Sequence, residues 1–357
     1  MKHNLLLLTL ACLLSWPTNA WTRESCIYSR HQYKNGFALH QINEDSQEIC
    51  AKQLEVCSFD KRHGDVLTSV LKIPDAIDGF EVTHIAPFAF AYNQSIYSVE
   101  IGSNICQIGR GAFLGCSNIV SVAMHGNVSP EMSIGADAFR HCTKLTSLTL
   151  PTGLRAIYDC AFEECSSIKD VYIPDRCASI AEDSFSHCRT LRTAHLGNID
   201  RHGENRMRFA FFDCPALEKI TTNPSNPTYV ICDGALYYRD LKAIVRCPSG
   251  HRGVSFSIKE GVEVVCPFAF EGCRFSSIVL PDSIAGIGRG AFSGCTNLVS
   301  IILPSRVKVI DDYAFWGCSN LVSVVVKGTD DPLFGEKVFP KEARIHRAGR
   351  GIFKQGE

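Results

Sequence analysis

Apolar residues recur along this chain with a period near 23 residues, and the most regular of them is a phenylalanine that follows an alanine in every copy but one, where Ser184 precedes it. These phenylalanines are Phe90, Phe113, Phe139, Phe162, Phe185, Phe211, Phe270, Phe292 and Phe315. Most copies have a cysteine three positions later: Cys116, Cys142, Cys165, Cys188, Cys214, Cys273, Cys295 and Cys318. A fixed period of this length is typical of a solenoid, in which stacked coils bury a core that no single coil could bury alone.

The positions between the phenylalanines predict the shape of one coil. In most copies the residues nine and eleven positions after the phenylalanine are apolar and alternate with others, as Leu148 and Leu150 do, which is typical of a strand with one buried face. Proline or glycine often follows, as Pro151 does, and turns the chain. Each coil is therefore predicted to be a short strand, a turn, a second extended stretch and a tight corner. We expect the phenylalanines to form a buried spine, the eight cysteines to lie beside it, and Glu163 to point outward.

The residues ten positions after each phenylalanine should face outward on the sheet. They change from polar near the N-terminus to aromatic and apolar further along: Tyr172, His195, Val279, Ile302 and Val325. Val279 is counted with them because the coil after Phe270 is one residue shorter. One interpretation is that β-branched residues merely favour strand at these positions. The other is that these five residues line a protein-binding surface, since exposed apolar patches often mark one.

The repeat resembles that of the BspA-like leucine-rich repeat family over residues from about 64 to 330. The resemblance is carried by Ile287-Gly-Arg-Gly-Ala-Phe-Ser-Gly-Cys-Thr-Asn-Leu-Val-Ser-Ile-Ile-Leu-Pro304 and by the segment that begins Ile73-Pro-Asp-Ala-Ile. It implies a repeat solenoid of the leucine-rich-repeat type, a right-handed coil with a parallel β-sheet on one face, made mostly of strands and turns with little helix. Members of that family are mostly secreted or surface proteins that bind other proteins or host matrix.

Four segments are expected along the chain. Residues 1–20 have a basic start, an apolar run and small residues before Ala20, which indicates a secretory signal peptide that is cut after Ala20. The segment Thr9-Leu-Ala-Cys12 also resembles a lipoprotein box, which leaves lipid anchoring as an alternative. An N-terminal cap at 21–63 should precede a solenoid of about ten coils at 64–330, with a longer variant unit near 222–260. A C-terminal cap is expected at 331–357, where Phe339 looks like a last, degenerate spine position.

The balance of charges limits the classes of binding partner, and the positions of the cysteines limit the disulfide bonds that are expected. The chain has 36 Lys and Arg against 37 Asp and Glu, a balance that argues against binding of nucleic acid or of a charged membrane surface. Eighteen cysteines in a secreted chain would suggest disulfides. However, equivalent residues of neighbouring coils are parallel and about 4.8 Å apart, which does not suit a disulfide. Disulfide candidates lie off the repeat instead, with the pairing left open: Cys26, Cys50 and Cys57, and Cys232 with Cys247.

The sequence gives no sign of catalysis, and we predict no catalytic residue, cofactor or metal. His141-Cys142 and His187-Cys188 recur only because the repeat recurs, and no Cys-x-x-Cys is present. No transmembrane segment is expected, while Asn127 matches a glycosylation acceptor pattern. The expected function is that of a secreted, periplasmic or cell-surface module for protein binding or adhesion, with another protein or a matrix or cell-surface component as partner. The alternative is a structural envelope or matrix protein without a discrete ligand.

Overall fold

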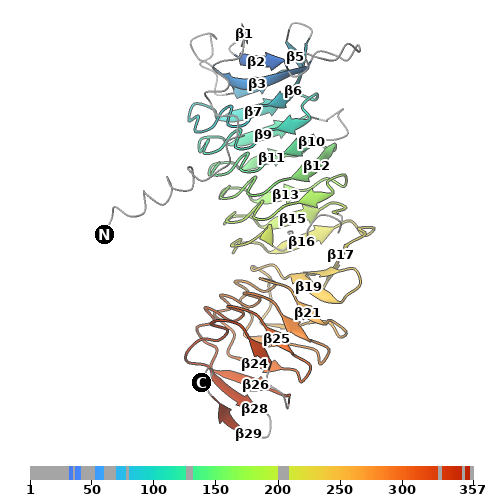
Figure 1. Cartoon of the computed structure of the whole chain (residues 1–357), viewed down its shortest axis with the longest axis vertical. Helices are drawn as coiled ribbons and strands as arrows, with labels where there is room; N and C mark the ends of the chain where they lie inside the picture. Colours follow the sequence, from blue (N-terminus) through green and yellow to red (C-terminus); the bar gives the residue numbers. More distant parts are fainter. Residues whose placement is uncertain are drawn as a thin grey trace, which may run out of the picture.

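The computed structural model describes residues 70–77, 81–125, 132–199, 209–328 and 332–347, together with the backbone of strands at 32–34, 37–41, 53–59, Phe80 and 350–353. This part of the chain is a β-solenoid of about 11 turns with parallel strands and no helix. Figure 1 shows the strands as successive rungs along the long axis of the molecule. The predicted fold class is thereby confirmed.

One column of strands, the first ladder, is formed by the alternating segments that follow each corner. These strands form four separate sheets, and within each sheet neighbouring strands of the ladder pair in parallel with equal register. Val99 therefore lies beside Val122 and Ile301 beside Val324, and the side chains between them face outward. The first ladder consists of β4 (Val70–Ile73), β7 (Ser98–Ile101), β9 (Ser121–Met124), β11 (Ser147–Thr149), β13 (Asp170–Tyr172), β15 (Thr193–Leu196), β16 (Lys219–Thr222), β20 (Ser255–Ser257), β22 (Ser277–Val279), β24 (Ser300–Leu303), β26 (Ser323–Val326) and β28 (Arg344–Arg347).

The second extended stretch of each coil also pairs with its neighbours and forms a second ladder. The aliphatic residue five positions before each spine phenylalanine ends these short strands, and it is buried, as Ile108 and Ile310 are. The sequence analysis predicted this extended stretch but expected a parallel sheet on one face of the solenoid only. The second set of paired strands was not predicted. Its strands are β6 (Phe80–Ile85), β8 (Gln107–Ile108), β10 (Met132–Ile134), β12 (Leu154–Ile157), β14 (Ser179–Ile180), β19 (Ala243–Arg246), β21 (Val264–Val265), β23 (Gly286–Ile287), β25 (Val309–Ile310) and β27 (Leu333–Phe334).

The spine phenylalanines stack ring on ring between the two ladders. Ring centroids from Phe90 through Phe211 are 5.0–5.8 Å apart, with interplanar angles of 14° or less. A second stack from Phe270 reaches Phe315 and continues to Phe339, which lies 5.1 Å from Phe315. The rings are buried, and each stacked pair adds about 0.5–1.5 kcal/mol to the gain from burying the ring. Repetition of one side chain at one corner thus produces a continuous aromatic core.

The repeat cysteines are hydrogen-bond donors as well as core residues. Each thiol except Cys273 donates to the main-chain carbonyl of the spine phenylalanine in the preceding coil; the Sγ–O distance is 3.0 Å from Cys116 to Phe90 and 3.2 Å from Cys165 to Phe139. Burial raises the pKa of the Cys116 thiol to about 11 and that of Cys214 to about 12. All eight are free thiols. Each donates to a buried carbonyl, and most of these carbonyls also accept a main-chain N–H, so the thiol adds a second hydrogen bond that a purely apolar side chain could not make.

The long unit interrupts both the spine and the repeat. Here β17 (Tyr229–Cys232), β18 (Ala235–Tyr238) and β19 form an antiparallel meander, and β19 then rejoins the second ladder through β21. The side chain of Arg246, only 2% exposed, fills the break between the two stacks. Its guanidinium donates to the carbonyls of Phe211 (2.9 Å) and Phe268 (2.8 Å) and pairs with Glu271 at 3.0 Å. Arg246 therefore donates to the Phe211 carbonyl, as a cysteine does in the other coils. It joins two parts of the solenoid, which we call the N-terminal block (residues 70–222) and the C-terminal block (residues 243–347).

Two expectations from the sequence are wrong. Cys232 and Cys247 are free thiols rather than a disulfide, because Cys247 lies buried against the next coil, where its carbonyl accepts from the Cys273 thiol at 3.7 Å. Glu163 does not point freely outward: its carboxylate pairs with Arg140 at 2.9 Å, and its side chain is 12% exposed.

The ends of the solenoid are closed by antiparallel strands. At the N-terminal end β1 (Gln32–Lys34), β2 (Phe37–Gln41) and β3 (Gln53–Phe59) form a meander whose last strand runs parallel to β6, and β5 (Ala76–Ile77) pairs with β6. At the other end β29 (Arg350–Phe353) folds back on β28. The predicted signal peptide at 1–20, Cys26, Cys50, the Cys57 side chain and Asn127 lie outside the described residues.

Candidate binding sites on the first ladder

The structure divides the predicted surface residues into two groups. Tyr172 and His195 are register partners on β13 and β15. Ile302 and Val325 are register partners on β24 and β26, and Val279 lies on β22. The long unit separates the two groups, so these five residues do not form one continuous strip.

The group in the C-terminal block is larger than the sequence indicated. Val299 and Val322 precede β24 and β26, are half exposed, and are linked by a main-chain hydrogen bond of 3.0 Å. Together with Val279, Ile302 and Val325 they form what we call the C-terminal apolar face. The sequence analysis did not consider the position seven residues after each phenylalanine, which is Thr, Lys or Arg in the coils of Phe139, Phe162 and Phe185, and it therefore missed Val299 and Val322.

The group in the N-terminal block is an aromatic pair. The Tyr172 ring is 59% exposed and stacks on the His195 ring, with 4.4 Å between centroids and an interplanar angle of 4°. His195 is fixed on its other side, where Nδ1 lies 3.0 Å from the Thr221 hydroxyl. Parallel pairing in exact register explains the stack, because it places equivalent side chains directly beside one another.

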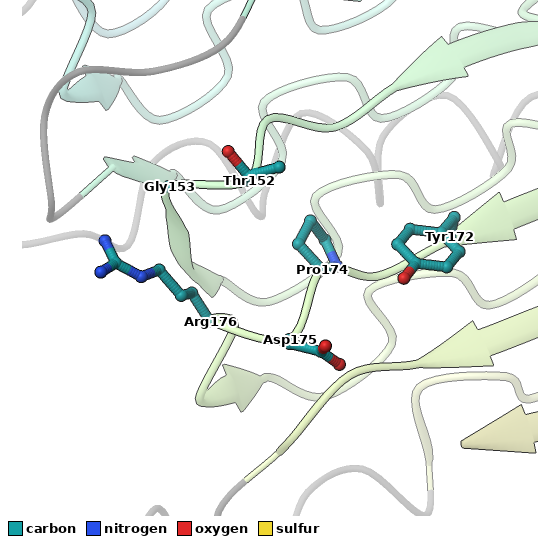
Figure 2. A pocket seen from close by; sticks show the side chains of 6 residues that line it. All are labelled: Thr152, Gly153, Tyr172, Pro174, Asp175 and Arg176. Atoms are coloured by element: carbon teal, nitrogen blue, oxygen red, sulfur yellow. The ribbon is translucent and has the colours of Figure 1, made fainter. Parts of the chain in front are cut away.

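A hollow of about 340 Å³ lies beside Tyr172, at the turn that follows β13. It is lined by Tyr172, Pro174, Asp175 and Arg176 of one coil and by Thr152 and Gly153 of the coil before. Figure 2 shows Pro174 between Tyr172 and Arg176, whose side chains point away from each other, with Thr152 on the neighbouring coil. The sequence analysis singled out Tyr172 but not the turn residues, because a proline turn recurs in several coils.

The first ladder is interrupted near this hollow, as it also is between β16 and β20 and between β22 and β24. β11 is the last strand of one sheet and β13 the first of the next, and in the described part of the chain the two strands are not paired. The interruption has a visible effect on burial: Leu148 and Leu150 are partly exposed, whereas the equivalent Val122 and Met124 are buried. The hollow therefore lies at a seam between two sheets.

Ionisable groups elsewhere on the described surface form pairs rather than a reactive centre. His141 Nδ1 lies 2.9 Å from Glu164, and His187 Nδ1 lies 2.8 Å from Asp213. Burial, with the nearby charges of Glu163 and Glu182, raises the pKa of Asp183 to about 6.

A thiol and an imidazole also meet in the second ladder, where Cys106 Sγ lies 3.6 Å from His84 Nε2. Burial raises the pKa of this thiol and lowers that of the imidazole, which favours the neutral pair over a nucleophilic thiolate. Among the described residues, no group of His, Cys, Asp or Glu is arranged to hold a metal ion. The same part of the chain contains no helix long and apolar enough to cross a membrane.

Comparison with known proteins identifies the repeat. A family model described as "BspA type Leucine rich repeat region (6 copies)" matches residues 71–192, 127–242 and 249–341. No curated protein matches the chain.

Solved structures of several bacterial proteins share the fold. A leucine rich cell surface protein from Faecalibacterium prausnitzii is 22% identical, with a TM-score of 0.54 over 83% of this chain and 88% of that one. A leucine-rich repeat protein from Eubacterium ventriosum is 20% identical, with a TM-score of 0.57 over 83% and 78% of the two chains. The pneumococcal vaccine antigen PcpA is 18% identical, with a TM-score of 0.60 over 89% and 87%.

Proposed function

The chain belongs to the BspA-type leucine-rich repeat family, and on that premise we propose that it is a cell-surface or secreted protein that binds another protein through the C-terminal apolar face. The observation that carries the proposal is a set of half-exposed aliphatic side chains on neighbouring coils, Val279, Val299, Ile302 and Val322, with the partly buried Val325 beside them. The equivalent positions of the N-terminal coils have mostly polar residues. A contiguous exposed apolar patch on a rigid scaffold is typical of protein interaction sites.

The rigidity of the scaffold supports a binding role. Ile302 and Val325 lie on paired strands whose inward-facing neighbours, Ile301 and Val324, are at most 1% exposed. A partner would meet a preformed surface and would not have to order it, which reduces the entropic cost of binding. The location at the cell surface is supported by the predicted signal peptide and by the printed description of the Faecalibacterium prausnitzii relative.

The test is a pair of matched substitutions on equivalent outward positions. Ile302→Glu places a charge in the C-terminal apolar face, and Thr149→Glu places the same charge at the equivalent exposed position of the N-terminal block. The purified variants are immobilised and exposed to purified matrix proteins and to solubilised host-cell surface proteins. We expect saturable binding that Ile302→Glu weakens at least tenfold and Thr149→Glu leaves unchanged, with equal melting curves.

Two outcomes would contradict the proposal. Saturable binding that survives Ile302→Glu would move the site away from the C-terminal apolar face. Absence of any saturable partner would favour the alternative function, a structural envelope or matrix protein without a discrete ligand.

A further inference from the structure

We infer that the C-terminal apolar face binds a protein segment that carries an acidic residue two positions from an apolar one, and that Arg344 takes the carboxylate. The inference rests on the proposed function, because it concerns the same face, and it names the kind of protein segment that the face fits. It is drawn from the strand that follows the face, from the pairing of the other charges beside it, and from the spacing of its strands.

β28 continues the C-terminal apolar face with an arginine and a histidine in place of serine and valine. It pairs in parallel with β26, so that Arg344 lies beside Ser323 and His346 beside Val325. Ile345 between them is buried, and Arg344 is exposed on the outward side. Figure 1 shows β24, β26 and β28 in succession toward the C-terminal end of the solenoid. The face is therefore bordered by a positive charge at a fixed place, one strand beyond Val325.

This charge has no acidic partner within the described part of the chain. The neighbour of Arg344 on β26 is Ser323, and Glu342, in the turn before β28, forms no ion pair with it. Asp282, which follows β22 beside the same face, is already paired with Lys327 at 3.2 Å. The guanidinium at the end of the face is therefore available to an acid of the partner.

The N-terminal end of the first ladder shows the opposite arrangement. Lys72 of β4 and Glu100 of β7 are register partners, and their charged groups pair at 3.0 Å. A positive charge on the outward surface is thus neutralised within the fold at one end of the ladder and left open at the other. Arginine is enriched among the residues that dominate interface energies, and it binds a carboxylate through two parallel hydrogen bonds.

The spacing of the strands sets the spacing of the partner's side chains. Arg344 and Val325 are diagonal neighbours on paired strands, a relation that corresponds to about 7–8 Å. In an extended peptide, residues two positions apart point to the same side and are about 7 Å apart. A peptide whose apolar side chain contacts Val325 therefore places an acidic residue, two positions away, over Arg344.

The combination of surfaces favours a protein segment over a polyanion. A sulfated polysaccharide would be attracted by Arg344, but it has no aliphatic side chain to bury against Ile302 and Val325. A protein segment supplies both groups. Burial of its apolar side chain would also exclude water from around the ion pair, which strengthens the attraction between the two charges.

The experiment selects peptides from a random phage-displayed library on the immobilised full chain. We expect the enriched peptides to carry Asp or Glu two positions from an aliphatic or aromatic residue. The most enriched peptide is synthesised with a fluorescent label, and its Kd is measured by fluorescence anisotropy. Ile302→Glu and Arg344→Glu should each raise this Kd at least tenfold. Lys219→Glu, the same charge change at the equivalent exposed position of β16, should leave it unchanged, and a melting curve checks that each variant is folded.

An exchange of charges tests the contact itself. A peptide with lysine in place of the acidic residue should bind the wild-type protein at least tenfold more weakly and should regain affinity for Arg344→Glu. A purely structural role of Arg344 would not produce this recovery. The original peptide should also bind more weakly as salt is added, because the Debye length falls from about 10 Å at 0.1 M to about 3 Å at 1 M.

The outcomes separate this inference from the proposed function. Enriched peptides that require Ile302 but carry no acid, or that bind Arg344→Glu unchanged, would overturn the inference and leave the proposed function standing. Peptides that bind Ile302→Glu unchanged would contradict the proposed function, and the inference with it. Two further results would replace the acidic protein segment by another occupant. Heparin binding that Arg344→Glu abolishes and Ile302→Glu does not would indicate a polyanion, and dimers in sedimentation velocity that Ile302→Glu dissociates would indicate a second copy of this chain.

Discussion

Replacement of Arg246 by methionine should weaken the connection between the two blocks of the solenoid. Methionine has a similar length and fills much of the same space, but it cannot donate hydrogen bonds. The carbonyls of Phe211 and Phe268 would each lose a donor, and the Glu271 carboxylate, whose side chain is 15% exposed, would lose its cation. The substitution therefore removes polar contacts at the break in the spine with little change in volume.

The size of the effect follows from what is left unpaired. The Phe268 carbonyl keeps the main-chain N–H of Glu271 as a donor, so the cost falls mainly on the Phe211 carbonyl and the Glu271 carboxylate. A buried carbonyl without its donor costs about 1–3 kcal/mol, and removal of one partner from a buried ion pair costs about 3–5 kcal/mol. The contributions overlap, since one guanidinium makes all three contacts, so we expect a loss of about 3–5 kcal/mol in the free energy of unfolding. Because each coil of a solenoid contacts only its neighbours, this loss falls on one interface and should uncouple the blocks.

Urea unfolding followed by circular dichroism measures both consequences. Wild-type protein should unfold in one transition, and Arg246→Met should show two transitions or one with a clearly lower slope. Arg252→Met is the control, because Arg252 is an arginine of the same unit with an 85% exposed side chain and should change stability by less than about 0.5 kcal/mol. A single transition in Arg246→Met, shifted by less than about 1 kcal/mol, would refute the assigned role of Arg246.

Three further predictions concern the core and the corners. Phe162→Ala should lower the free energy of unfolding by about 3–5 kcal/mol in urea, whereas the exposed Lys169→Ala on the same coil should not, and equal losses would refute the stacked spine. Iodoacetamide should leave Cys142, Cys165 and Cys188 unlabelled in native protein and label them in urea, as read by mass spectrometry; a disulfide between any two of them would contradict the ladder. Asp183→Asn should raise the free energy of unfolding by about 1 kcal/mol at pH 7.5 but give no gain at pH 4. An equal gain at both pH values would contradict the raised pKa of Asp183. The sign follows because the folded-state pKa of Asp183, about 6, lies above its ordinary value of 3.8, so the folded state binds the proton more tightly and the ionised carboxylate opposes folding above pH 6.

Repetition made the core predictable from the sequence. Phe162 or Cys165 alone could occupy many environments, but the same residues at the same phase in many copies leave only a stacked position, and the structure places them there. The outward position of Tyr172 and Ile302 followed from the same phase and the two-residue alternation of a strand.

Features that occur once were not predictable in this way. Arg246 lies in the long unit, where no second copy fixes its phase, so nothing in the sequence distinguishes it from an exposed arginine. The break in strand pairing between β11 and β13 was not predictable either. Both coils fit the repeat pattern, and only the structure shows that their strands are not paired. The Glu163 ion pair depends on an arginine from the preceding coil, a contact between coils that the pattern within one coil does not contain.

The buried repeat cysteines imply that two processes compete while the protein folds: oxidation of the exposed thiols and stacking of the coils that encloses them. In the unfolded chain the repeat cysteines are ordinary thiols, which an oxidising environment can convert to disulfides within seconds to hours. Once a coil stacks on the one before it, its thiol is enclosed and donates to a carbonyl, as Cys188 does, and oxidants no longer reach it. Contacts between neighbouring coils are local in sequence and form early. The yield of native protein should therefore depend on the redox conditions only in the interval before stacking, and a reductant added at the start of refolding should serve as well as one present throughout.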